Sequence, residues 1–130
     1  MRLHDFTVWR AARELAAEIY RTTCSRAFAG DATLRLEMRD RATSIMTSLA
    51  AAYERHDCAG FREFLTSANG AAAELESLLY LAEDAGLLAT ANASPLHRKV
   101  RDVKRQVDTV DKAAARYDRL GHAAVGESAG

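Results

Sequence analysis

Four long stretches of the chain carry apolar residues three and four positions apart, which is the period of an α-helix. Few helix breakers interrupt these stretches, because the 130 residues include seven glycines and one proline. Alanine is abundant, and it loses no side-chain entropy in a helix. Helices patterned in this way bury their apolar stripes against one another. We therefore expect an all-α fold.

The first two helices are predicted over residues 6–23 and 32–55. Asp5 is the expected N-cap of the first helix, and Asp31, which follows a glycine, is the expected N-cap of the second. Each segment has one apolar face. A connection of a few residues joins them, so the two helices should lie side by side and antiparallel.

The third helix is predicted from Ala59 to Gly86, because glycine suits the position just after a helix end. A loop over residues 88–94 follows, and Ser94-Pro95 predicts the start of the last helix, since proline fits the first turn. Gly121 is its expected end. The last helix has the most regular stripe, with alternating spacings of four and three residues: Leu96, Val100, Val103, Val107, Val110, Ala114 and Tyr117.

The predicted architecture is an up-and-down antiparallel four-helix bundle over residues 1–120. Its mass of 14.2 kDa suits a single domain. Residues 121–130, which are rich in glycine and alanine, are expected to form a flexible C-terminal tail.

Charge and hydropathy exclude several classes of protein. The 18 basic and 18 acidic residues cancel, so the whole chain is not a strongly basic nucleic-acid binder, although one face could be basic. No apolar run approaches the roughly 20 residues that span a bilayer. No secretion signal is visible at the start. We expect a cytoplasmic protein without membrane association.

No catalytic or metal-binding motif is visible. Cys24 and Cys58 belong to no CxxC pattern, and a bundle would hold them roughly 35 Å apart, so both are expected to be free thiols. We expect no enzymatic activity, no metal and no cofactor. Solvated histidines are favoured over the one conceivable metal site, which would combine His4, His56, Cys58 and His122.

A row of basic residues follows the last helix opposite its apolar stripe. At 100° per residue its members fall within an arc of about 60°. A solvated face is the commonest meaning of such a row. The sharper hypothesis is a ridge of roughly 30 Å that binds phosphates, and arginine suits bidentate phosphate contacts. The ridge comprises Arg98, Arg101, Arg105, Lys112, Arg116 and Arg119.

Several large apolar residues lie beside the predicted core stripes or away from them. Single exposed apolar residues are normal on any surface, but several at the margins of a bundle favour a subunit contact. The predicted contact residues are Trp9, Tyr20, Leu36, Tyr80 and Leu81.

The order and spacing of residues 6–88 resemble a known family. The residues that carry the resemblance are Phe6-x-x-Trp9-x-x-Ala12-x-x-Leu15 with Ile19-Tyr20, Arg39-x-x-Ala42-x-Ser44-Ile45, Phe64-Leu65-x-x-Ala68-x-Gly70-x-x-x-Glu74-Leu75-Glu76 and Leu79-x-Leu81-Ala82-x-x-x-Gly86-x-Leu88. They are similar to the four-helix bundle proteins related to the 23S ribosomal RNA intervening-sequence protein. That family includes the accessory variability determinant of diversity-generating retroelements.

The resemblance implies a homopentamer without enzymatic activity. For the retroelement members it further implies binding to a reverse transcriptase and to RNA. Five copies would repeat the ridge five times, and avidity would then offset the neutral overall charge. We therefore expect a non-enzymatic oligomeric accessory protein that binds RNA electrostatically. The alternative is a protein–protein scaffold that does not bind nucleic acid, and a third hypothesis is a bundle that binds a small molecule or metal.

Overall fold

A computed structural model of the chain describes the backbone of residues 2–129 and the side chains of residues 2–121. Helices make up almost all of this part of the chain, and it contains no strand. The prediction of an all-α fold is therefore confirmed. The elements are η1 (Leu3–Asp5), α1 (Thr7–Thr23), α2 (Arg26–Ala29), α3 (Ala32–Tyr53), α4 (Cys58–Asp84) and α5 (Thr90–Ala129).

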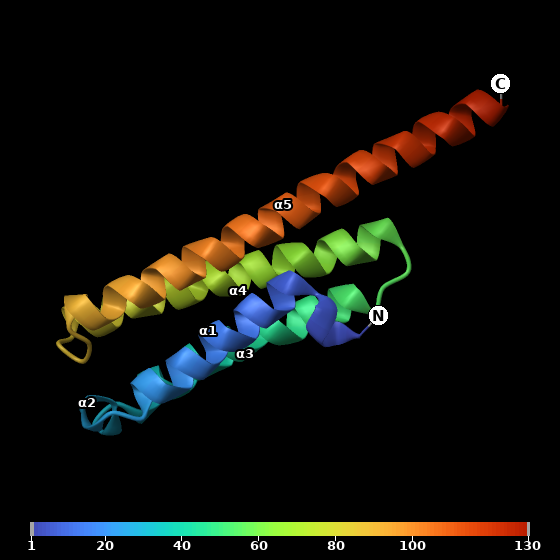
Figure 1. Cartoon of the computed structure of the whole chain (residues 1–130). Coiled ribbons are helices and arrows are strands. Elements are labelled where there is room, and N and C mark those ends of the chain that lie inside the picture. The colour runs from blue at the N-terminus through green and yellow to red at the C-terminus, as the bar shows by residue number, and fades with distance from the viewer. Residues whose placement is uncertain (1, 130) are drawn as a thin grey trace.

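The four long helices form an up-and-down bundle, as the sequence predicts (Figure 1). Each runs antiparallel to the one before it, and each packs on two neighbours. Helices α1 and α4 therefore occupy opposite corners, and both contact α3 and α5. One continuous core fills the centre; its largest fully buried side chains are Phe28, Leu15, Ile19, Met38, Ile45, Leu49, Leu65, Leu75, Leu79, Val100, Val103 and Val107.

Side-chain caps and a glycine fix three of the helix ends. Asp31 accepts a hydrogen bond of 3.0 Å from the amide of Leu34, as its predicted N-cap role requires. Asp57 caps α4 in the same way through the amide of Gly60, at 2.8 Å. At the other end of α4, Gly86 has a φ of 75°, which glycine adopts without strain.

Two predicted helix starts are wrong. Phe6, not Asp5, is the N-cap residue of α1, because the Asp5 carboxylate accepts a hydrogen bond from the backbone amide of Arg2 at 2.8 Å. Helix α5 begins at Thr90, five residues before Pro95. Proline has no amide hydrogen, so Pro95 leaves the backbone carbonyl of Ala91 without its helical hydrogen bond. The helix tolerates this loss because Ala91 is exposed to water.

The connection between α1 and α3 contains a structure that the sequence did not predict. The four residues of α2 place Phe28 in the core with none of its surface exposed. A single aromatic residue in a short segment has no periodicity to reveal it. Phe28 closes this end of the bundle.

The predicted end of the last helix at Gly121 is also wrong. Helix α5 continues through Gly121 to Ala129, because glycine lowers helix stability without preventing helix formation. Beyond Gly121, the side chains of the predicted flexible tail at 121–130 lie outside the described residues, and so does Gly130. Its flexibility stays a prediction.

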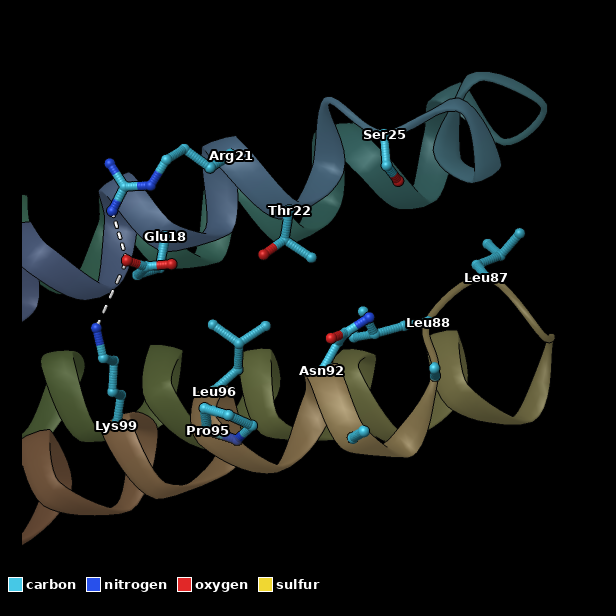
Figure 2. Close-up of a pocket in the computed structure, with 12 residues that line it drawn as sticks. Glu18, Arg21, Thr22, Ser25, Leu87, Leu88, Asn92, Pro95, Leu96 and Lys99 are labelled. Carbon is cyan, nitrogen blue, oxygen red and sulfur yellow. Dashed lines mark hydrogen bonds and ion pairs between the residues drawn. The ribbon is translucent and has the colours of Figure 1, made fainter.

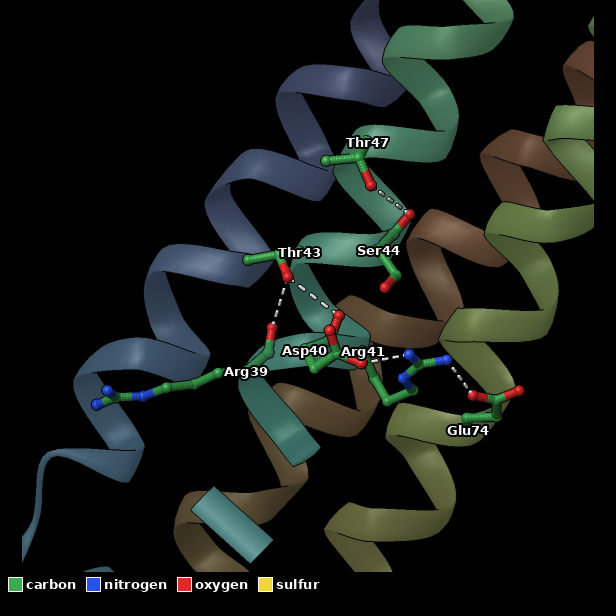
Figure 3. Close-up of polar contacts among 7 residues, drawn as sticks. All are labelled: Arg39, Asp40, Arg41, Thr43, Ser44, Thr47 and Glu74. Carbon is green, nitrogen blue, oxygen red and sulfur yellow. Dashed lines mark hydrogen bonds and ion pairs between the residues drawn. The ribbon is translucent and has the colours of Figure 1, made fainter. Parts of the chain in front are cut away.

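Polar contacts join α3 to α4 on the outer face of the bundle (Figure 3). Arg41 of α3 donates a hydrogen bond of 2.6 Å to Glu74 of α4 and also pairs with Asp40. These two carboxylates, Asp40 first, raise the pKa of the Arg41 guanidinium. Nearby, the hydroxyl of Thr43 donates to backbone carbonyls of its own helix. Two carboxylates thus share the one guanidinium, and the positive charge of Arg41 is fully matched within the bundle.

Both cysteines are free thiols, as predicted. Cys24 is exposed after the end of α1, whereas Cys58 opens α4 and is half-buried. The thiol of Cys58 donates to the carbonyl of Ala114 at 3.4 Å, so the start of α4 lies beside α5 at that level.

Replacement of Gly86 tests the C-terminal end of α4. Gly86→Ala should lower the free energy of unfolding by about 1 kcal/mol or more, because alanine is strained at positive φ. Gly30→Ala is the matched control. A methyl group at Gly30 would likewise meet open space, but the φ of Gly30 is −80°. That variant should be neutral or slightly more stable. Equal denaturant midpoints for the two variants would contradict the positive φ of Gly86.

Candidate nucleic-acid interface

Burial of the apolar stripe of α5 determines which face of the helix meets solvent. Leu96, Val100, Val103 and Val107 are at most 4% exposed. Because of the helix period, the residues that lie half a turn around α5 from this stripe point away from the core. All six residues of the predicted ridge are exposed on this outer face, over about 31 Å from Arg98 to Arg119.

Two of the six ridge cations have carboxylate partners. Arg105 donates to Asp102 at 2.6 Å, and Arg101 lies 3.6 Å from Glu76 of α4. Both contacts are at the surface, where an ion pair contributes little free energy and exchanges readily. The other four have no hydrogen bond or ion pair with any residue in the described part of the chain: Arg98, Lys112, Arg116 and Arg119.

The carboxylate of Asp102 is the acidic group that most directly counters the ridge. Arg105 and Gln106 both donate hydrogen bonds to it, and these bonds, with that of Arg105 first, hold the pKa of Asp102 below its usual value. Asp102 is therefore ionised at neutral pH. It neutralises Arg105 in the absence of a ligand.

The apolar stripe of α5 loses its cover before the helix ends. Val110 and Ala114 are half-buried, but Tyr117 is 76% exposed and Leu120 is 70% exposed. The prediction that Tyr117 belongs to the buried stripe is therefore wrong. Figure 1 shows that α5 extends past the ends of the other helices. The start of α4 lies at the level of Ala114, and the part of α5 from there to Ala129 adds about 22 Å at roughly 1.5 Å per residue.

The side of α5 that faces α4 is closed by polar contacts. Arg62 donates to Asp111 at 2.9 Å, and this carboxylate raises the pKa of the guanidinium. Asn69 donates to Asp108 at 2.7 Å. Together with the contact between Arg101 and Glu76, these pairs hold α5 in register on α4. They leave little net charge on this side.

The predicted subunit contact residues are distributed over three helices. On α3 and α4, Leu36, Tyr80 and Leu81 are more than half exposed. On α1, Tyr20 is 43% exposed, but the guanidinium of Arg39 lies over its ring at 4.4 Å. Trp9 is half-buried and packs against the core. Among these five residues, the most exposed apolar side chains therefore lie on α3 and α4 rather than on α1.

A buried polar pair joins α4 to α5, and sequence reasoning missed it. His97 is 4% exposed, and its Nε2 lies 2.7 Å from Oε1 of Glu83. The ring of Tyr80 stacks on the imidazole at 4.2 Å. A glutamate and a histidine 14 positions apart give no periodic signal, so the pairing becomes visible once the antiparallel register of the helices is known.

Two further features concern metal binding and membrane crossing in the residues that the structure describes. In that part of the chain, no three His, Cys, Asp or Glu residues gather closely enough to hold a metal ion. Likewise, none of the described helices combines the length and the apolar character that crossing a membrane requires.

Fold and surface together define an all-α bundle protein with one cationic helix face. The chain belongs to the 23S rRNA-intervening sequence protein family, whose model matches residues 4–109. The match includes Arg98, Arg101 and Arg105, but it ends before the other half of the ridge. Among curated proteins, none matches the chain.

A solved structure supports the fold. The chain is similar to a protein of unknown function from the S23 ribosomal protein family of Bacteroides thetaiotaomicron, with a TM-score of 0.74 and 18% sequence identity. The similarity covers 81% of this chain and 98% of that protein. At this identity the likeness shows the fold alone.

The contact between Arg105 and Asp102 can be tested by titration. Arg105→Ala should raise the pKa of Asp102 toward its ordinary value, because the largest stabilising contact of the carboxylate is lost. NMR of the carboxyl carbon across a pH series would measure the change. Arg98→Ala, which removes an exposed guanidinium one turn away, is the control and should leave the value unchanged. An unchanged titration in Arg105→Ala would show that Arg105 is free in solution.

Proposed function

We propose that this chain is a non-enzymatic accessory protein that self-associates and binds RNA electrostatically through the ridge on α5. One observation carries the proposal. Six cations are exposed along one face of one helix, and four of them are unpaired within the described residues. Membership in a family named for an intervening sequence of 23S rRNA is consistent with an RNA ligand.

The chemistry of the ridge suits a phosphate backbone. Five of its six cations are arginines, whose planar guanidinium can donate two parallel hydrogen bonds to one phosphate. Each neutralised phosphate releases counterions, which makes affinity fall steeply with salt. The ridge contains no aromatic side chain on which bases could stack. Binding should therefore depend weakly on sequence.

Self-association would multiply a modest charge. The whole chain is neutral, so one copy attracts RNA weakly at long range. A homopentamer, which the family resemblance implies, would present five ridges, and linked sites bind with much higher avidity than single ones. The exposed Leu36, Tyr80 and Leu81 support such an assembly.

The identity of a protein partner rests on the resemblance. If the chain acts like the accessory determinant of diversity-generating retroelements, its partner is a reverse transcriptase. The same exposed apolar residues also favour the second candidate function, a protein–protein scaffold without RNA binding. Charge reversal on the ridge separates the two functions.

Reversal of two unpaired ridge cations tests RNA binding. Lys112→Glu/Arg116→Glu should weaken binding of a labelled RNA oligonucleotide more than about tenfold, because two phosphate contacts become repulsive. Fluorescence anisotropy over a salt series measures the affinity, and the salt dependence should be shallower in the variant. Arg26→Glu/Arg41→Glu carries the same change of charge on α2 and α3 and should bind nearly as the parent does. Equal affinity in the ridge variant would exclude this function.

Absolute mass tests self-association. The parent should scatter light as a particle of about 71 kDa, five times the 14.2 kDa subunit. Leu81→Glu should give a smaller particle, since a charge would be buried at the contact. Thr66→Glu, on an exposed position of the same helix about 22 Å away, is the matched control. A parent protein of 14.2 kDa in solution would rule out the assembly.

A further inference from the structure

A continuous groove runs between α1 and α5, and its cations come from both helices. Three neighbouring hollows lie along this side of the bundle, and Lys99 lines all of them. Glu18 and Arg21 line two of the three, and so do Glu14 and Pro95. Because the hollows share walls, they form one surface feature, the α1–α5 groove.

The groove carries an excess of positive charge in a neutral protein. Three carboxylates line it: Glu14, Glu18 and Asp102. Six cations oppose them, so three positive charges are in excess. The cations are Arg10, Arg13 and Arg21 from α1, and Arg98, Lys99 and Arg105 from α5.

The carboxylates of the groove are already shared. Figure 2 shows Glu18 between two cations, with Arg21 at 2.5 Å on its own helix and Lys99 of α5 at 3.7 Å. The hydrogen bond from Arg21, followed by the weaker effect of Lys99, outweighs desolvation and lowers the pKa of Glu18. Asp102 is likewise shared between Arg105 and Gln106. One carboxylate thus serves several donors and leaves them hydrogen-bonding capacity for a ligand.

The remaining cations of the groove are open to an anion. Arg98 has no ion pair with any described residue, and Arg10 donates to the backbone carbonyl of His4 at 2.9 Å. The guanidinium of Arg13 lies 5.7 Å from the ring of Trp9. The two sides of α5 therefore differ: carboxylate and amide contacts close the side toward α4, whereas three of the guanidinium groups on the side toward α1 have no carboxylate partner among the described residues, namely those of Arg10, Arg13 and Arg98.

We propose that the α1–α5 groove binds the sugar–phosphate backbone of RNA, with the arginines of α1 as the second wall of the site. This inference rests on the proposed function and extends it, since Arg98 and Arg105 belong to both the groove and the ridge. Arg10 and Arg21 are about 16 Å apart along α1, so the wall can contact several successive phosphates of one strand. The described lining includes no aromatic side chain, so the groove reads charge and shape rather than bases.

Removal of the α1 cations tests the groove. Arg10→Gln/Arg21→Gln should weaken RNA binding by the full-length protein about fivefold or more. The slope of log affinity against log salt should fall by about 1.4, or 0.7 for each lost contact with a single strand. Arg41→Gln/Arg55→Gln is the matched control. It also removes two surface arginines that form ion pairs or backbone contacts, but they lie on α3 and after its end. Circular dichroism and light scattering would verify that fold and assembly persist.

A gain of charge provides an independent test that loss of folding cannot imitate. Glu14 lines two of the hollows and has no hydrogen bond or ion pair with another described residue. Glu14→Lys should therefore tighten RNA binding severalfold. The matched control is Glu63→Lys, on an exposed position of α4 at the opposite corner of the bundle, and it should change affinity much less.

The outcomes separate the groove from the proposed function. If Lys112→Glu/Arg116→Glu weakens RNA binding and the α1 variants do not, the groove proposal is overturned while the function stands. If the α1 variants alone weaken binding, the groove stands and the outer ridge does not contact RNA. A competition experiment with polyglutamate tests whether the groove prefers RNA to an acidic protein. Displacement of RNA at equal charge concentration would assign the groove to an acidic protein and overturn the proposal.

Discussion

The burial of one apolar stripe of α5 is the constraint on which the rest of the structure depends. Its valines have branched side chains that lower helix propensity, so the helix relies on packing against α1 and α4 for stability. The same packing fixes the rotation of α5. A shift of one residue would turn every side chain by 100°. The exposed position of Arg98 or Arg116 is thus a consequence of where Val100 and Val107 are buried.

Internal partners then decide which of the exposed cations are available to a ligand. A guanidinium that already donates to a carboxylate, as Arg62 does to Asp111, must break that hydrogen bond to bind a phosphate, so binding gains less free energy. An unpaired guanidinium such as that of Arg98 loses only bound water and counterions when it binds a phosphate. The asymmetry between the two sides of α5 therefore produces a local positive field, although the chain as a whole has no net charge.

Periodicity predicted the four long helices and the outward direction of the ridge, because both depend on spacing within a single helix. It could not predict contacts between residues that the fold brings together from distant positions. Lys99 reaches Glu18, and His97 meets Glu83, only through the antiparallel register of separate helices. The early start of α5 was missed for another reason. Proline is compatible with the second turn of a helix as well as the first when water can reach the carbonyl that loses its hydrogen bond.

The geometry of the bundle is compatible with the proposed assembly and the proposed RNA binding at the same time. Helices α1 and α4 occupy opposite corners, so contacts through Tyr80 or Leu81 on α4 leave the groove beside α1 open. The apolar residues on α1 are less suited to a subunit contact, since Arg39 covers the ring of Tyr20. An assembly built through α3 and α4 would therefore direct the grooves of all subunits away from the contacts. Each copy would add the excess positive charge of its groove to one array. A chain with no net charge would then bind a polyanion because several copies act together, not because the chain is rich in basic residues.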